Sequence, residues 1–102
     1  MYLQNVTFNI DTQSEAEFLS WMKTQHIPEI METGLPTSFK VLKLLTEVHN
    51  GGSTYSFQYA FETKQHYDIY EALHFDGLIA KVDQRYKGKY VFFASLLQEI
   101  DV

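Results

Sequence analysis

The sequence has no cysteine, which excludes disulfides, thiolate metal sites and cysteine nucleophiles. Only two prolines and five glycines interrupt its 102 residues. No apolar run approaches the roughly 20 residues that a membrane span needs. Eight lysines and arginines stand against 13 acidic residues, so the basic stripe that nucleic acid demands is missing. We therefore expect a protein that binds neither nucleic acid nor a membrane.

The chain also lacks the signals that divide or export a protein. No linker, repeat or low-complexity tract separates one part from another, so residues 1–102 are predicted to form a single domain. The first residues contain no basic region followed by an apolar stretch, and no signal peptide is expected. Together with the missing cysteines, this predicts a cytoplasmic protein.

Aromatic residues are plentiful instead, at 16% of the chain, and many of them follow a period of two. Residues 2–10 place Val6, Phe8 and Ile10 on one side and mostly polar residues on the other. Residues 53–62 alternate in the same way, with aromatic side chains on one face. This alternation is typical of strands that bury a single face.

Two further strands are predicted at residues 38–48 and 90–98, and both are apolar on both faces. The connection from His49 to Gly52 contains Asn50 and Gly51, residues that tolerate a positive φ angle. The segments 38–48 and 53–62 are therefore expected to form a hairpin.

The segment after the first strand has the period of an amphipathic helix, with an apolar arc that includes Trp21 and His26. Two capping boxes compete for its start: Thr12 with Glu15, and Ser14 with Glu17. Pro28 has no N–H to donate, so we expect the helix to break or kink there, with a short further turn to Thr33.

A second helix is predicted from Thr63, which can cap it, to about Tyr86. Gly77 is a candidate break within it, and Gly88 is its natural stop. The elements then follow the order β-α-β-β-α-β. This is the ferredoxin-like plan of the α+β class, a four-stranded antiparallel sheet with two helices on one face.

Two helices on one face of the sheet leave the other face open. Its centre would carry polar residues of the first and third strands: Asn5, Thr7, Asn9, Ser56 and Gln58. Its margins would carry apolar residues of the edge strands: Leu42, Leu44, Val48, Val91, Phe93 and Leu97. Such a patch marks an interface, so we expect a homodimer with stacked sheets and a wet chamber between them. A bulge in an edge strand would exchange its faces and remove this argument.

Several segments spread over nearly the whole chain resemble one known family. They are Tyr2–Asp11, Trp21–Lys23, His26–Glu29, Thr33–Gly34, Leu44–Thr46, Thr54–Tyr59 and Gly88–Val91. The sequence is similar to a bacterial family of domains of unknown function, DUF4286, within the dimeric α/β barrel superfamily. The resemblance implies the ferredoxin-like fold and a dimer, and it implies no particular reaction.

Five polar residues are candidates for ligand binding: Asn5, Asn9, His26, Ser56 and Gln58. The amides and the hydroxyl could bind a small polar ligand in the chamber, or they could bond ordered water or one another across strands. His26 could act as a general base or a ligand. The alternative is a buried histidine whose ring bonds a carbonyl that Pro28 leaves free.

No catalytic residue can be named, because no nucleophile–base or acid–base pair is recognisable. His66 and His74 are eight residues apart, not four, so no metal is expected. No cofactor is expected either, and Gly51 and Gly52 lie in a hairpin and not in a phosphate-binding loop before a helix. The favoured hypothesis is a non-catalytic homodimeric domain that binds a small ligand or serves assembly through its open sheet face. The second hypothesis, implied by the superfamily, is a cofactor-independent enzyme of the monooxygenase or isomerase type with its site in the chamber.

Overall fold

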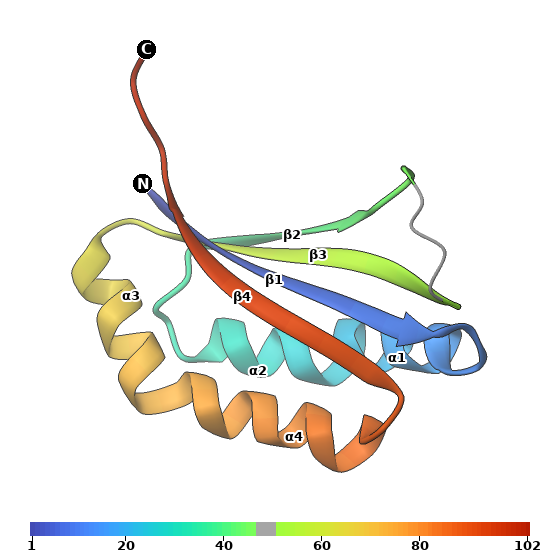
Figure 1. The fold of residues 1–102 in the computed structure, drawn as a ribbon. Coiled ribbons are helices and arrows are strands. Elements are labelled where there is room, and N and C mark those ends of the chain that lie inside the picture. Colours follow the sequence, from blue (N-terminus) through green and yellow to red (C-terminus); the bar gives the residue numbers. More distant parts are fainter. Residues whose placement is uncertain (47–50) are drawn as a thin grey trace.

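The computed structural model describes residues 1–46 and 51–102 as one layer of sheet and one layer of helices (Figure 1). The sheet contains β1 (Tyr2–Asp11), β2 (Ser38–Lys43), β3 (Gly52–Phe61) and β4 (Tyr90–Gln98). After the short turn η1 (Thr12–Ser14), the first long helix consists of α1 (Glu15–Trp21), the π turn η2 (Met22–His26) and α2 (Ile27–Glu32). The second long helix consists of α3 (Lys64–Tyr70), the π turn η3 (Glu71–Phe75) and α4 (Asp76–Tyr86).

The four strands lie in the order β2-β3-β1-β4, and every neighbouring pair is antiparallel. Both long helices cover the same face, below the sheet in Figure 1. The ferredoxin-like plan predicted from the sequence is thereby confirmed. Pairing of β4 with β1 runs without interruption from Tyr2 opposite Gln98 to Ile10 opposite Tyr90. Because no bulge shifts the register there, the predicted faces of this edge strand hold.

The core lies between the sheet and the helices, and aromatic side chains of β1 and β3 form its floor. Phe8 and Phe57 meet edge to face, with ring centroids 5.5 Å apart, and Phe18 of α1 packs against both rings. All three side chains are buried. The predicted apolar arc of the first helix is therefore correct, because burial of these rings orients the helix on the sheet.

The predicted break at Pro28 takes a different form, since the helix continues through this residue. The N–H of Ile27 bonds the carbonyl of Met22, five residues back, instead of the usual four. This wide turn accommodates a proline in the first turn of α2, where no intrahelical donor is needed. At the start of α1, Ser14 caps the helix without a side-chain hydrogen bond, and the Thr12 hydroxyl donates to the Gly51 carbonyl at 3.2 Å, so neither predicted capping box is seen.

The second long helix begins as predicted at Thr63, whose hydroxyl oxygen accepts a hydrogen bond from the backbone N–H of His66 at 3.1 Å. Gly77 lies within α4 and does not break it, so that expectation is wrong. The irregularity is instead the π turn η3, which ends immediately before α4. Gly88 ends the helical segment with a φ angle of 80°.

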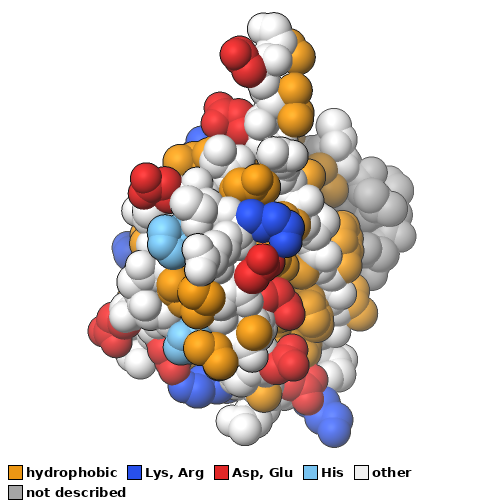
Figure 2. Space-filling view, turned by 90° about the vertical axis from the view of Figure 1, so that its left-hand side faces the viewer, with side chains coloured by type: hydrophobic (Ala, Val, Ile, Leu, Met, Phe, Trp, Pro, Cys, Tyr) orange, Lys and Arg blue, Asp and Glu red, His pale blue; other side chains and the backbone are white. Residues whose placement is uncertain are grey.

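The first arm of the predicted hairpin is shorter than expected, because β2 ends at Lys43. Val48, His49 and Asn50, which the sequence placed in this arm and its turn, lie outside the described residues. Hydrophobic side chains remain at the surface, interspersed with acidic and basic groups on the side of the molecule that Figure 2 shows. No helix among the described residues is both long and apolar enough to cross a membrane.

Candidate functional site

Six polar side chains form a strip along the middle of the open sheet face, here called the polar strip. It consists of Asn5, Thr7 and Asn9 of β1 and Thr54, Ser56 and Gln58 of β3. The register sets them opposite one another in pairs: Asn5 with Gln58, Thr7 with Ser56, and Asn9 with Thr54. The structure thus brings together four of the five ligand-binding candidates, Asn5, Asn9, Ser56 and Gln58.

Hydrogen bonds connect the members of the polar strip across the two strands. The Asn9 amide donates to the Thr54 hydroxyl at 3.0 Å, and the Ser56 hydroxyl donates to the Asn5 side-chain oxygen. The Gln58 amide reaches the Ser56 hydroxyl at 3.5 Å. Of the alternatives that the sequence left open, bonding across strands is therefore observed. Amide and hydroxyl groups of this kind can both donate and accept hydrogen bonds, which is also what binding of a polar ligand requires.

Apolar side chains flank the polar strip on both edge strands. On β4, Val91 is 68% exposed and Phe93 is 62% exposed, and Leu97 shares their face. On the opposite edge, Leu42 of β2 and the following Leu44 are also exposed. Large apolar side chains at this exposure are unfavourable in water, so this face has the character of an interface.

His26 lies on the other side of the sheet and does not join the polar strip. Its ring is 2% exposed and stacks on Trp21 at a centroid distance of 4.8 Å. Among the described residues, nothing accepts or donates a hydrogen bond at its Nδ1 atom. Burial in this apolar setting lowers the pKa of His26 to about 4, which keeps the ring neutral at physiological pH.

A small cavity of about 10 Å³ adjoins His26, with Tyr59 and Tyr70 also in its wall. The Tyr59 hydroxyl has no hydrogen-bond partner among the described residues, and its burial raises the pKa of the phenol. This volume is about that of one water molecule. Sequence reasoning missed Tyr59, because it counted the ring as a core aromatic and ignored its hydroxyl.

Gln4 is a second polar residue that the sequence did not single out. It points to the helix side of β1, is 1% exposed, and its amide makes no hydrogen bond of normal geometry within the described part of the chain. The amide faces the Tyr67 hydroxyl closely enough to oppose the rise that burial produces in the tyrosine pKa. The signal was present in the sequence, as a glutamine in an otherwise apolar alternation.

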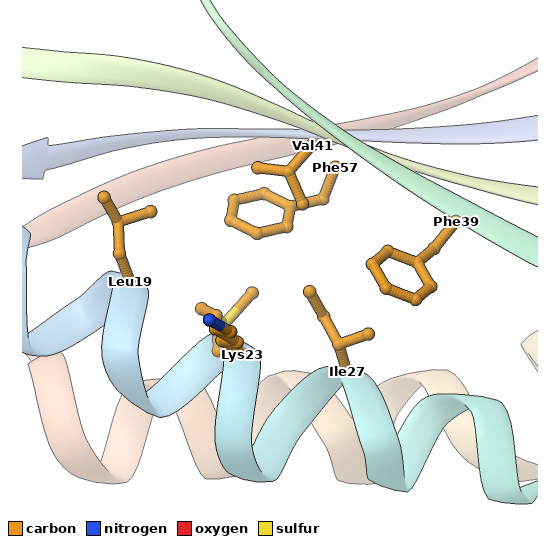
Figure 3. A pocket seen from close by; sticks show the side chains of 7 residues that line it. Leu19, Lys23, Ile27, Phe39, Val41 and Phe57 are labelled. Carbon is orange, nitrogen blue, oxygen red and sulfur yellow. The ribbon is translucent and has the colours of Figure 1, made fainter.

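An apolar groove separates the first long helix from the edge of the sheet. It encloses about 360 Å³ and is lined by Leu19, Met22, Lys23, Ile27, Phe39, Val41 and Phe57. Figure 3 shows Leu19, Lys23 and Ile27 on successive turns of the helix, with Leu19 and Ile27 pointing toward the side chains of the two strands. Phe39 remains 50% exposed because the helix does not cover it. No sequence pattern predicted this groove.

No group of three or more metal-binding side chains comes together within the described residues. His66 and His74 lie in separate segments of the second long helix, in α3 and in η3, and His74 stacks on Tyr70 instead. Neither histidine lies near the polar strip, since the helices and the strip are on opposite faces of the sheet (Figure 1).

Comparison with known proteins identifies a matching family and several solved structures of similar fold. The profile of a family described as Domain of unknown function (DUF4286) matches residues 1–100. No protein with a curated description matches the sequence. Similar solved structures include HapK from Hahella chejuensis, with 10% identity, a TM-score of 0.69, and coverage of 100% of this chain and 95% of that one.

Two other similar structures extend this picture. An antibiotic biosynthesis monooxygenase is 13% identical with a TM-score of 0.64, over 99% of this chain and all of that one. A dimeric ferredoxin-like protein from an uncultured marine organism is 15% identical with a TM-score of 0.58, over 100% of this chain and 95% of that one. At these identities the likeness shows the shared ferredoxin-like fold alone.

Proposed function

This chain belongs to the family of DUF4286, a domain of unknown function, and we propose that it acts as a homodimer that holds a small polar ligand between two stacked sheets. The observation that carries the proposal is the open sheet face, a polar strip between two apolar margins. A second copy turned about a two-fold axis would cover both margins at once. The existence of dimeric proteins with the same fold supports this arrangement.

The charges of the open face favour pairing of two copies. The chain as a whole carries a formal charge of −5, which would oppose contact between acidic surfaces. On this face the strands carry only Lys40 of β2 and Asp11 at the end of β1, two charges of opposite sign at the margins. The acidic excess therefore lies elsewhere, and stacking of the sheets brings no cluster of like charges together.

The polar strip would be enclosed when the margins meet. Asn5, Asn9, Ser56 and Gln58 would then line the enclosed space and present amide and hydroxyl groups to a ligand. His26 belongs to the core on the other side of the sheet, so it is not part of this binding site.

Native mass spectrometry of the purified protein tests both parts of the proposal. The expected spectrum shows two chains plus a small additional mass. Phe93→Glu places a carboxylate in the margin and is expected to give single chains without that mass. Leu73→Glu is the matched control, because Leu73 is 73% exposed on the helix side and lies outside the interface. Single chains of the unmodified protein at micromolar concentration would refute the dimer, and dimers without additional mass would refute the ligand.

A further inference from the structure

The apolar groove lies on the helix side of the sheet, away from the open sheet face. Its wall on one side is the first long helix and on the other the edge strand β2, with Phe57 of β3 as its floor (Figure 3). A volume of about 360 Å³ falls within the range of pockets that hold small molecules. Val41 is 39% exposed and Phe39 is 50% exposed, so apolar surface is left in water along the strand. An apolar occupant would cover it.

Other parts of the chain lie beyond the lining residues at the two ends of the groove. At one end Lys43, the next residue after Val41 on the same face of β2, pairs with Glu15 at 3.6 Å. Glu15 also accepts hydrogen bonds from Ser53 and Tyr55, and the bond from Tyr55 lowers the pKa of the carboxyl. At the other end the chain itself crosses from α2 to β2 through residues 33–37.

Lys23 supplies the one charge in the lining of the groove. It lies midway along the helical wall, between Leu19 and Ile27 (Figure 3). Within the described parts of the chain, Lys23 forms no ion pair, whereas Lys43, which follows Val41 on the same face of β2, pairs with Glu15. A cation without a carboxylate partner beside apolar side chains complements an anionic group on an apolar body.

We propose that the apolar groove binds a small amphipathic acid, with its hydrocarbon part against Val41, Phe39 and Phe57 and its carboxylate on Lys23. The hydrocarbon supplies most of the binding free energy by covering the apolar walls. The carboxylate fixes the orientation of the molecule, because the groove offers a single cation. This site lies on the helix side of the sheet, so it does not depend on the homodimer.

Titration with octanoate, followed by amide NMR shifts, tests the proposal. Saturable shifts are expected at Lys23, Ile27 and Val41, and 1-octanol is expected to shift the same amides. Lys23→Met keeps the length and apolar stem of the side chain but removes its charge. This variant is expected to bind octanoate about fivefold more weakly, which corresponds to the loss of one partly exposed charge pair. Its affinity for 1-octanol is expected to stay unchanged.

Two further variants separate the charge from the apolar walls. Lys40→Met is the matched control, because Lys40 lies on the same strand but on the open face, opposite Gln58. It is expected to leave binding of both compounds unchanged. Val41→Gln makes the β2 wall of the groove more polar and is expected to weaken the binding of both octanoate and 1-octanol.

Four outcomes would overturn the proposal. The first two are amide shifts confined to the open face around Phe93, and equal affinity for octanoate in Lys23→Met and the unmodified protein. The third is a titration that does not saturate at millimolar octanoate. The fourth is amide shifts in the groove that follow protein concentration without any added acid. The last outcome would identify a second copy of the chain as the occupant. Because Lys23→Met leaves the open face intact, its mass in solution reports separately on the proposed homodimer.

Discussion

His26 shows how the surroundings of one residue determine its chemistry. The helical arc predicts correctly that it faces the apolar core, and the ring stacks on Trp21 there. Burial removes the imidazolium from water, and this cost outweighs the attraction of Glu29, so the pKa falls from its ordinary value of 6.5 to about 4. A residue with the chemistry of a general base is thereby held neutral and away from the polar strip.

The depressed pKa of His26 predicts a specific loss of stability in acid. The unfolded chain binds a proton at this residue as the pH falls through 6.5, whereas the folded chain stays neutral until about 4. The stabilisation is complete above pH 6.5 and is lost as the pH falls toward 4. The linkage amounts to about 3 kcal/mol. Denaturant unfolding at a series of pH values is expected to show this loss in the unmodified protein and its absence in His26→Phe.

The control for this measurement is His66→Gln, because His66 is exposed near the start of α3. Its stability is expected to follow that of the unmodified protein at every pH. If His26→Phe and the unmodified protein lose the same free energy of unfolding between pH 7 and pH 4, the loss of stability comes from protonation of another residue. The assignment to His26 would then be wrong.

At the scale of the element, the stability of the second long helix depends on how its first turn is capped. Thr63 is extended, with a φ angle of −129°, and its side chain caps the first turn of α3. Thr63→Ala is expected to lower the free energy of unfolding by about 1 kcal/mol, because a backbone N–H loses its partner. Thr63→Ser keeps the hydroxyl and is expected to retain most of that stability. Equal unfolding midpoints for both variants would show that the cap contributes nothing.

The strands could be predicted from the sequence because a period of two places each side chain on a definite face. The polar strip follows from that rule and from the strand order, whereas the register that sets Asn5 opposite Gln58 is given by the structure alone. The wide turns could not be predicted in the same way. Pro28 indicates an irregularity in the first helix, but residues 71–75 contain no proline or glycine, so no residue type in that segment indicates its π turn.

The candidate sites also differ in how much of them the sequence predicts. Sequence reasoning grouped His26 with Asn5 and Gln58, because inward-facing residues look alike whether they lie above or below a sheet. The structure places His26 and the polar strip on opposite sides. The apolar groove was missed for a different reason. It depends on the distance between α1 and β2, which no local pattern of Leu19 or Val41 contains.

At the scale of the whole molecule, surface ion pairs tie the two long helices together. Arg85 of α4 pairs with Glu17 of α1, and Lys81 of α4 pairs with Glu29 of α2. All four side chains are close to half exposed, so each pair contributes little to stability. The stability of the folded chain should therefore depend more on the buried aromatic core and, if the proposed dimer forms, on the covered sheet face.

Dimerisation through the sheet face predicts that thermal stability depends on protein concentration. The midpoint of unfolding is expected to fall by about 4 °C for each tenfold dilution, because dissociation accompanies unfolding. Phe93→Glu is expected to unfold at a midpoint that does not change on dilution. Scanning calorimetry over a wide range of concentrations measures both. A constant midpoint for the unmodified protein would contradict coupling between folding and assembly.

The π turns in the two long helices have a consequence for the history of the chain. A π turn holds one residue more than the α-helical path between the same two ends. The turns at Met22–His26 and Glu71–Phe75 fall at matching places in the two βαβ halves. A relative without them would be shorter by one residue in each half, with its strands unchanged. Sequences of such relatives would align with this one only through a single-residue gap inside each helix, where gaps are usually forbidden.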